Sequence, residues 1–332
     1  MTKNATRLRT TEKICRLAKR LRHLFSFNTL YVLFYLIRNF FTHDVIFTRS
    51  WVERKKFETV LPYNWGDELN KYFIEFITGR KVVLMDSSLP IKHYSMIGSV
   101  LSFYNQYKAV VYGSGLIEGS QKVRGTPEKI ISVRGPLTRQ ALIQKGFDCP
   151  EKYGDPAMLL PVFYSPSRKK QNHMLVIPHW RTYAHNRNNA PLTELQEKYH
   201  CRAITMTAYD KWTDIIDEIA GSDFVISESL HGVIVSETYN VPCLWVEFSD
   251  HRTGFFHTSL DWSFKFRDFY ESIGKHNMSS MKLYEGFNFD DILRAKDKWR
   301  PGKIDYAELL SLFPFEIKPE FLPRIKKFLQ GS

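Results

Sequence analysis

Short apolar runs alternate with longer amphipathic stretches from about residue 51 onward. Most of the apolar runs are rich in β-branched residues, are bounded by Gly, Pro or Ser, and precede a stretch of helical periodicity. This alternation predicts an α/β protein built in layers. The predicted strands are Val82–Met85, Ala109–Tyr112, Ile130–Val133, Met174–Ile177, Phe224–Ile226 and Cys243–Val246.

A polar segment, Ser165–Asn172, separates the first three predicted strands from the last three. It contains Pro and reads as a linker between two halves. The length of 332 residues suits two domains of roughly 150 residues each. We therefore expect one α/β domain at 51–164 and a second at 173–332, which carries the helices at the end of the chain.

The first 50 residues form a separate basic and aromatic segment in this division. Residues 1–43 hold nine Lys and Arg against the single acid Glu12, so a net +8 of the chain's +12 lies there. The other 289 residues carry about +4. A charge concentrated at one end argues against a nucleic-acid groove across the fold, and the mildly basic remainder suits a small anionic substrate.

An apolar run, Leu24–Ile37, follows the basic residues. Its fourteen residues are fewer than the ~20 that span a bilayer, and no small-residue cleavage site follows, which argues against a secretory signal. Two interpretations remain open for residues 24–41. The segment lies on the inner face of the cell membrane, attracted by anionic lipid, or it packs on the protein body or at an oligomer contact.

The overall composition excludes several classes of protein. With 43% hydrophobic and 15% aromatic residues the chain can bury an interior, so intrinsic disorder is not expected. Four cysteines lie far apart, without the paired spacing of a disulfide framework or a cysteine zinc site. We expect a cytoplasmic protein without a metal site.

The first candidate site is the sequence Asn-Trp-Gly-Asp-Glu-Leu-Asn at 64–70. Helical spacing of apolar residues follows it, so Asp67 is predicted to be the N-cap of a helix that stops at Gly79. Gly66 would let the backbone approach a ligand, and the helix start offers N–H groups to an anion. The alternative is a capped helix without a ligand.

Two further candidates follow predicted strands in the first half. The loop Gly113-Ser114-Gly115 has little side chain and suits an approach to phosphate or sugar, although such glycine pairs are common. Arg134 stands at a strand end beside a helix that starts at Pro136, where a guanidinium can grip an anion. The alternative is an Arg that pairs with a carboxylate to lock the turn. Asp155 lies in a second short loop and has the same ambiguity.

The strongest candidate lies in the second half, at Glu228-Ser229-Leu230-His231-Gly232. It connects a predicted strand to a helix, so His231 is predicted in the first helical turn above a strand end. An imidazole there can titrate near neutrality and act as acid or base. His179 and Arg181 follow the first strand of this half and would face a cleft between the halves.

Five motifs in order make this chain resemble the polysaccharide pyruvyl transferase family, in particular its succinoglycan ketal-forming branch. They are NWGDELN, VRGPLTRQAL, GDPAMLL, SLHGVIVSETYNVP and FKFRDFYESIG, and the resemblance covers about residues 57–275. It implies two Rossmann-like domains facing a cleft, as in GT-B glycosyltransferases. It also implies phosphoenolpyruvate as donor, a surface glycan or its lipid-linked precursor as acceptor, and no metal or cofactor requirement.

The chemistry that the resemblance implies leads us to the following hypothesis for the candidate residues. Catalysis is assigned to His231, Asp67 and Asp155. Donor binding is assigned to Arg134, Arg181, His179, Ser229 and the loop Gly113-Ser114-Gly115, and acceptor binding to Asn64, Gly66 and Glu228. Several family members have Arg immediately before the Leu-His pair, where this chain has Ser229. This departure shifts anion binding to the remaining cations.

Two other functions are left open by the sequence. One is a glycosyltransferase that uses a nucleotide sugar, in which Glu237 would bind the donor. The other is a non-catalytic protein of glycan assembly, suggested by the departure at Ser229.

Overall fold

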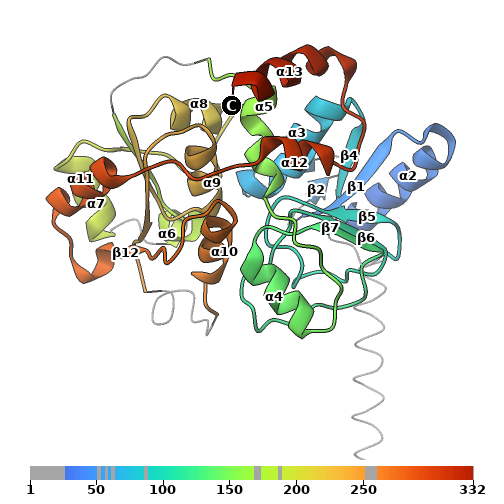
Figure 1. Ribbon diagram of the computed structural model, residues 1–332, viewed down its shortest axis with the longest axis horizontal. Coiled ribbons are helices and arrows are strands. Elements are labelled where there is room, and N and C mark those ends of the chain that lie inside the picture. The colour runs from blue at the N-terminus through green and yellow to red at the C-terminus, as the bar shows by residue number, and fades with distance from the viewer. Residues whose placement is uncertain are drawn as a thin grey trace, which may run out of the picture.

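The computed structural model describes residues 27–50, 54–56, 59–60, 64–85, 89–167, 173–185, 189–250 and 260–331. Residues 1–26, with most of the basic segment, and 168–172, the end of the expected linker, lie outside the described residues. The chain forms two α/β lobes side by side, and each has a five-stranded parallel sheet (Figure 1). The prediction of an α/β protein is confirmed.

The first sheet has the order β4-β1-β5-β6-β7. Its strands are β1 (Val45–Arg49), β4 (Lys81–Met85), β5 (His93–Ser95), β6 (Ala109–Tyr112) and β7 (Lys129–Ser132). The second sheet has the order β12-β11-β10-β8-β9, with β8 (Met174–Ile177), β9 (Arg202–Ala203), β10 (Phe224–Ser227), β11 (Cys243–Glu247) and β12 (Met281–Lys282). Numbered within each half, both orders read 2-1-3-4-5, the doubly wound order of flavodoxin-like sheets.

All six predicted strands are present, with bounds within one residue of the prediction. The expected boundary at residue 51 does not match the first sheet, because β1 precedes it and pairs with β4 from Val45↔Lys81 to Arg49↔Met85. Helix α2 (Phe27–Thr42) also belongs to this lobe. It covers one face of β1 and β4, and α3 (Trp65–Thr78) covers the other.

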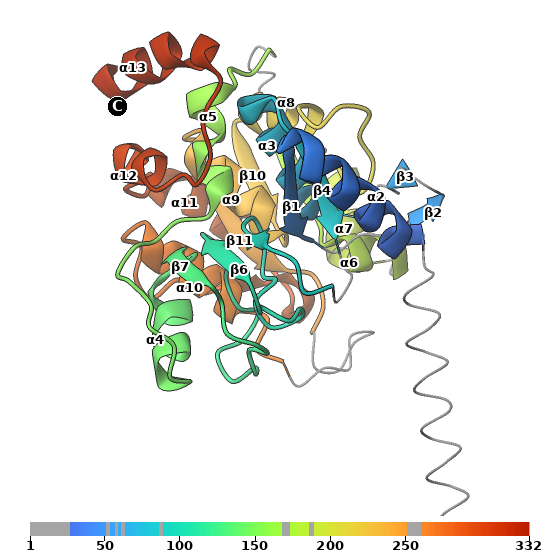
Figure 2. The same cartoon turned by 90° about the vertical axis from the view of Figure 1, so that its right-hand side faces the viewer.

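Period-2 alternation along β1 and β4 explains this arrangement. Val45, Phe47, Val83 and Met85 point toward α2 and form a small core with its buried face. The residues between them, Ile46, Val82 and Leu84, point toward α3 and join the main core. The two layers are visible in Figure 2. Two short antiparallel strands, β2 (Arg54–Lys56) and β3 (Thr59–Val60), lie at the same edge of the molecule.

The main core runs across both lobes. It includes Leu69 and Phe73 of α3 together with Val233 of α9 and Trp245 of β11. On this side the second sheet carries α8 (Asp214–Ala220), α9 (Leu230–Thr238) and α10 (Phe264–Ser272), while α7 (Ala190–Glu197) and α11 (Phe289–Lys298) cover the other side. Three further helices are α4 (Pro136–Gln144), α5 (Leu160–Phe163) and α6 (Trp180–His185).

The end of the chain returns to the first lobe, contrary to the expected division at residue 173. Helices α12 (Tyr306–Ser311) and α13 (Leu322–Gly331) lie over the lobe of α3 and α5 (Figure 1). The Tyr112 hydroxyl donates to the Leu309 carbonyl oxygen at 2.6 Å, and the Lys318 amide donates to the Ile77 carbonyl oxygen at 2.9 Å. The last helices therefore pack on the first half, and the Tyr306 hydroxyl of α12 also donates to the Thr238 carbonyl oxygen of the second half.

Candidate functional site

A cavity of about 340 Å³ lies between the two lobes and takes its walls from both. The first lobe contributes Asn64, Asp67, Gly98, Ser99, Val100, Phe103, Tyr104 and Ile117. The second contributes His179, Trp180, Arg181, Met206, Ser229, Leu230, His231, Leu260, Trp262 and Lys265. Six residues assigned to the site from the sequence are among them: Asn64, Asp67, His179, Arg181, Ser229 and His231.

The position of the cavity follows from the strand order. In an open parallel sheet of order 2-1-3-4-5, ligands bind outside the carboxyl ends of the two strands where the order reverses. In the second sheet these are β8 and β10, which pair directly, and Arg181 and His231 lie in the first turns of the helices that follow them, α6 and α9. In the first sheet they are β1 and β5, which lead to Asp67 and to Gly98. The two switch points thus face the same cavity.

Helix α3 presents Asp67 to the cavity, but Asp67 is not its N-cap as predicted. The helix starts at Trp65 with Asn64 as N-cap. The second lobe fixes this earlier start, because the Trp65 amide donates to the Met206 carbonyl oxygen at 2.8 Å and its indole N–H to the Trp212 carbonyl oxygen at 2.7 Å. Asp67 therefore lies in the first turn. The predicted end at Gly79 is correct, with φ of 71°.

The Asp67 carboxyl is held between polar groups of its own loop. Its Oδ2 accepts a hydrogen bond from the Asn64 side chain at 2.7 Å. Burial raises the pKa of Asp67 to about 7, and the Asn64 hydrogen bond and the charge of Lys265 oppose this rise only in part. Asp67 can therefore hold a proton near neutral pH.

His231 lies in the first turn of α9, as predicted, and is 7% exposed. Burial lowers its pKa to about 3, and the charges of Lys265 and Arg134 act in the same direction. The imidazole is therefore neutral at physiological pH. Its Nε2 has no hydrogen-bond partner among the described residues, which leaves it able to bond with a ligand.

Gly66 brings the starts of α3 and α9 together. A Cβ atom at Gly66 would lie 1.9 Å from Nδ1 of His231, so only glycine allows this contact between the lobes. Neither N-cap side chain, Asn64 or Ser229, accepts a hydrogen bond from the first turn of its helix. The positive ends of two helices therefore meet beside the cavity, an arrangement that favours a bound anion.

Lys265 was not assigned to the site from the sequence, although it lies in the motif at 264–274. It is on α10, lines the cavity, and its ammonium lies 5.0 Å from the centre of the Trp262 ring. Burial is the main cause that lowers the pKa of Lys265 to about 8, and repulsion from the Arg134 charge lowers it further. The negative charge of Asp67 acts in the opposite direction. Apolar spacing around Lys265 resembles an ordinary helix, so only the folded arrangement reveals it.

His179 reaches the cavity from the loop after β8, and Arg181 from the first turn of α6. The Arg181 guanidinium lies 4.9 Å from the centre of the Trp180 ring. Glu228 holds this loop in place, since its carboxylate accepts from the His179 amide at 2.9 Å and from the Phe248 amide at 3.0 Å. Glu228 is 3% exposed and does not line the cavity, so the geometry gives it the role of orienting the loop.

Arg134 occupies a different place from the one its donor-binding assignment requires. It is fully buried and does not line the cavity. Its guanidinium donates to Asp268 Oδ2 at 3.0 Å, to Ser99 Oγ at 2.6 Å and to the Leu116 carbonyl oxygen at 2.5 Å. The geometry is that of the alternative interpretation, an Arg paired with a carboxylate, and it joins the first lobe to α10.

The loop at 113–115 and Asp155 are also interior. Gly113 has φ of 76° and lies against the Gly154 carbonyl oxygen, whereas Gly115 lies against the Arg134 guanidinium. Ser114 Oγ donates to the Gly98 carbonyl oxygen at 2.9 Å. The close approaches that these glycines permit are therefore within the protein, not to a cavity ligand.

Asp155 is fully buried and accepts from the Ala157 amide at 3.0 Å, so it caps the next helical turn. Burial raises the pKa of Asp155 to about 6. Its second carboxyl oxygen has no hydrogen-bond partner among the described residues. The Asp155 side chain does not line the cavity. Its catalytic role stays a prediction.

Glu237, the residue that would bind a nucleotide sugar, lies elsewhere. It is buried on α9, where it pairs with Lys275, accepts from the Trp299 indole at 3.1 Å and accepts from the Gly302 amide at 3.2 Å. It does not line the cavity. Across the described residues, no group of three or more His, Cys, Asp or Glu side chains is arranged to hold a metal ion.

Comparison with known proteins finds one matching family model and two relatives. A model of the polysaccharide pyruvyl transferase family matches residues 86–250. An uncharacterized protein of Acanthamoeba polyphaga mimivirus is 27% identical over 190 residues, which are 56% of this chain and 64% of that protein. The succinoglycan biosynthesis protein ExoV of Rhizobium meliloti (strain 1021) is 26% identical over 219 residues, which are 64% of this chain and 62% of ExoV.

The matched regions thus span less than two thirds of the length of both relatives. The family match begins directly after β4 and includes the starts of α6 and α9, where Arg181 and His231 lie. It therefore includes most of the cavity wall described above. Residues 86–250, just under half of this chain, match the polysaccharide pyruvyl transferase family.

Proposed function

We propose that the chain transfers the pyruvyl group of phosphoenolpyruvate to a sugar of a polysaccharide, or of its lipid-linked precursor, and forms a cyclic ketal. The coarser role, modification of a polysaccharide, rests on the family and on the relation to ExoV. The proposal includes a GT-B-like arrangement of the two lobes and a cytoplasmic reaction. One observation supports the finer function. A single cavity is lined by the cations Arg181 and Lys265, by Asp67, whose pKa is raised, and by His231, whose pKa is lowered.

The donor carries a phosphate and a carboxylate, so its site must be electropositive. Arg181 precedes His231 in the sequence and Lys265 follows it, and both side chains line the cavity. The N-terminal ends of α3 and α9 add their positive partial charges. Lys265 thus supplies a cation in a chain that has Ser229 where several family members have Arg. We propose that Lys265 and Arg181 bind the donor anions.

Asp67 and His231 are suited to the proton transfers. Environments that push two pKa values apart commonly distinguish the acid from the base. Asp67, with a pKa of about 7, holds a proton that it can give to the methylene carbon of phosphoenolpyruvate. His231, neutral with a pKa of about 3, can accept the proton of an attacking sugar hydroxyl. This assignment gives Asp67 the role of acid and His231 that of base.

The reaction then follows in two additions. Protonation turns the methylene into a methyl group and leaves a cationic carbon, to which the first sugar hydroxyl adds and loses its proton. The C–O bond to phosphate breaks, and a second hydroxyl of the same sugar attacks the renewed cation and closes the ring. Overall, one hydroxyl proton ends on the methyl group and the other on the released phosphate. The cations of the cavity stabilise the phosphate as it leaves.

The test uses the full chain with phosphoenolpyruvate and succinoglycan-derived oligosaccharides. We expect phosphate release that depends on the oligosaccharide, together with a product whose mass has increased by one pyruvyl ketal. Calorimetry with phosphoenolpyruvate and with UDP-glucose compares the two donor classes. Binding of UDP-glucose without binding of phosphoenolpyruvate would overturn the proposal and favour a glycosyltransferase.

A further inference from the structure

Helix α2 has two apolar faces, although only one of them packs on the protein. Tyr31, Val32 and Tyr35 are nearly fully buried against β1 and β4. This contact confirms that the segment packs on the body, one of the two interpretations of the sequence. The opposite side of the helix is also apolar, and packing on the body does not account for it.

The outer face forms a continuous stripe on the helix. Leu30, Phe34, Ile37 and Phe41 follow one another at spacings of four, three and four residues, which places them on one side. With the neighbouring Phe40, their exposed fractions are 43% for Leu30, 50% for Phe34, 65% for Ile37, 77% for Phe40 and 75% for Phe41. We call these five residues the α2 stripe. They are half of the ten exposed large apolar side chains among the described residues, gathered on one helix.

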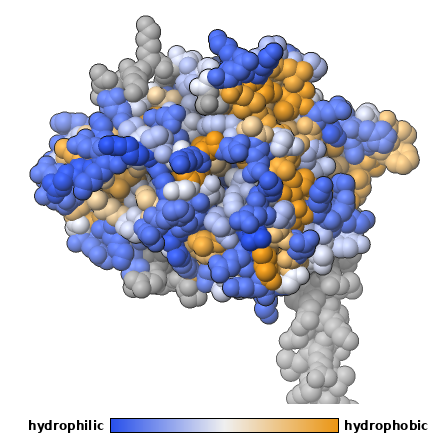
Figure 3. Space-filling model, in the orientation of Figure 1, coloured by the Kyte–Doolittle hydropathy of each residue, from blue (hydrophilic) through white to orange (hydrophobic). Residues whose placement is uncertain are grey.

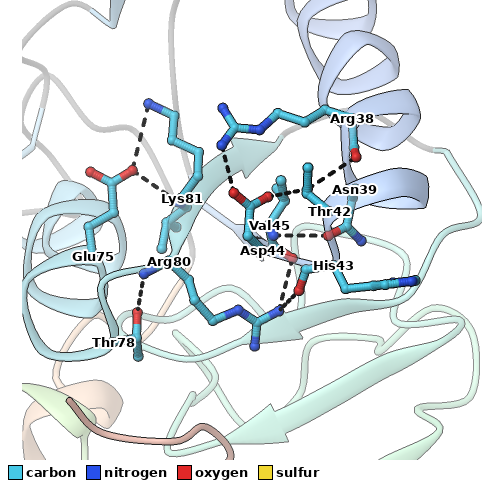
Figure 4. Close-up of polar contacts among 11 residues, drawn as sticks. Arg38, Asn39, Thr42, His43, Asp44, Val45, Glu75, Thr78, Arg80 and Lys81 are labelled. Carbon is cyan, nitrogen blue, oxygen red and sulfur yellow. Dashed lines mark hydrogen bonds and ion pairs between the residues drawn. The ribbon is translucent and has the colours of Figure 1, made fainter. Parts of the chain in front are cut away.

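The stripe is held in a fixed position on the lobe. At the end of α2, Arg38 pairs with Asp44 at 2.6 Å, and the Asn39 side chain accepts from the Val45 amide at 2.9 Å (Figure 4). These contacts tie the helix to the first strand of the sheet. Figure 3 shows apolar surface at the protruding edge of the molecule where α2 lies in Figure 1. The stripe is therefore a preformed convex surface, which suits contact with a flat partner.

Positively charged residues flank this stripe in the sequence. Residues 1–26, which precede α2, hold eight Lys and Arg against Glu12, a net +7. Strand β2 lies beside α2, and its sequence is Arg-Lys-Lys (Figure 2). An apolar helix face flanked by cations in the sequence fits a lipid bilayer, which has an apolar acyl-chain interior and anionic head groups at its boundary.

We propose that the α2 stripe docks on an anionic membrane surface, with α2 parallel to the membrane plane. Side chains of this size reach the boundary between head groups and acyl chains, while the basic residues bind anionic lipid. Among the described residues, no helix is long and apolar enough to cross a membrane. A second copy of the chain fits the stripe less well, because it would bring two strongly positive segments together.

The test is flotation of the full chain with vesicles of phosphatidylcholine alone and with phosphatidylglycerol added. The stripe variant Phe34→Gln/Ile37→Gln/Phe41→Gln is compared with a control, Ile143→Gln/Leu293→Gln/Leu322→Gln, which removes three exposed apolar side chains elsewhere. We expect the unchanged chain and the control to bind only the anionic vesicles, and less at high salt. The stripe variant should bind at least about tenfold more weakly while its unfolding temperature is unchanged.

Three results would overturn the proposal. The stripe variant binds anionic vesicles as well as the control does, so that charge alone explains binding. The unchanged chain binds neither kind of vesicle. In the third result, light scattering shows a dimer that the stripe variant loses, while the variant still binds vesicles. This would assign the stripe to contact with a second copy of the chain. None of these measurements depends on transfer activity, so the proposed function is tested separately.

Discussion

Substitution of Gly66 by Ala is the sharpest test of the geometry at the start of α3. A Cβ atom there would lie 1.9 Å from Nδ1 and 2.3 Å from Cε1 of His231. Atoms in contact lie about 3.5 Å apart, so the overlap is about 1.5 Å. The imidazole is a rigid ring on a buried helix, and it can escape only if the ring or one of the two helices moves.

The size of the effect can be worked out from opposing contributions. Extra volume in a filled interior costs about 1–3 kcal/mol, and the rigid ring places this case at the upper end. Replacing a helical glycine by alanine returns about 1 kcal/mol of helix propensity. We expect a net loss of about 2 kcal/mol in the free energy of unfolding. Displacement of His231 by about 1 Å should lower transfer about a hundredfold.

The assays are urea denaturation and acceptor-dependent phosphate release. Gly331→Ala is the matched control, because Gly331 is also helical and a Cβ there would meet nothing within 4 Å. In the double variant Gly66→Ala/His231→Ala the clash is removed, so its loss of stability should be smaller than the sum of the two single losses. Full stability and full activity of Gly66→Ala would refute the predicted contact between α3 and α9.

Three further predictions concern the charged groups. Asp67→Asn should lower the transfer rate about 10²–10⁴-fold and leave phosphoenolpyruvate binding nearly unchanged. Because the acid must be protonated and the pKa of Asp67 is raised to about 7, the transfer rate of the unchanged chain should fall as the pH rises above 7. A flat pH profile would contradict this role. Lys265→Met should weaken phosphoenolpyruvate binding about 10–100-fold in calorimetry, since a charge-assisted hydrogen bond is lost, whereas Lys282→Met at an exposed site should not. Arg134→Met should lower the free energy of unfolding by about 3–5 kcal/mol by leaving the buried Asp268 unpaired; unchanged stability with weaker donor binding would return Arg134 to the donor site.

Local patterns in the sequence predicted the elements and part of the site. Apolar runs and glycine boundaries are local signals, so they predicted the six strands and the strand-to-helix connections beside which Arg181 and His231 lie. Strand β1 was missed, since Val45–Arg49 lies next to the basic segment and was assigned to it. The equal strand order of the two sheets is not visible in the sequence, where no repeat is detectable.

The burial of Arg134 required long-range information. Its carboxylate partner, Asp268, is 134 residues away and belongs to the other half of the chain. A strand-end arginine with a carboxylate partner and one with a bound anion have the same local sequence. Lys265 shows the reverse case, in which a lysine inside an aromatic helix motif reaches the cavity only because α10 packs on the first lobe. Contacts between the halves therefore decide both roles.

The return of the chain end to the first lobe limits how the lobes can move. The chain crosses between them a second time between Lys303, whose amide donates to the Ile273 carbonyl oxygen, and Leu309, which accepts from Tyr112. The first crossing lies between Tyr164 and His173. Between the two crossings the lobes also share the main core and the buried Arg134–Asp268 pair. The two lobes should therefore unfold together, in one cooperative transition, rather than independently of each other.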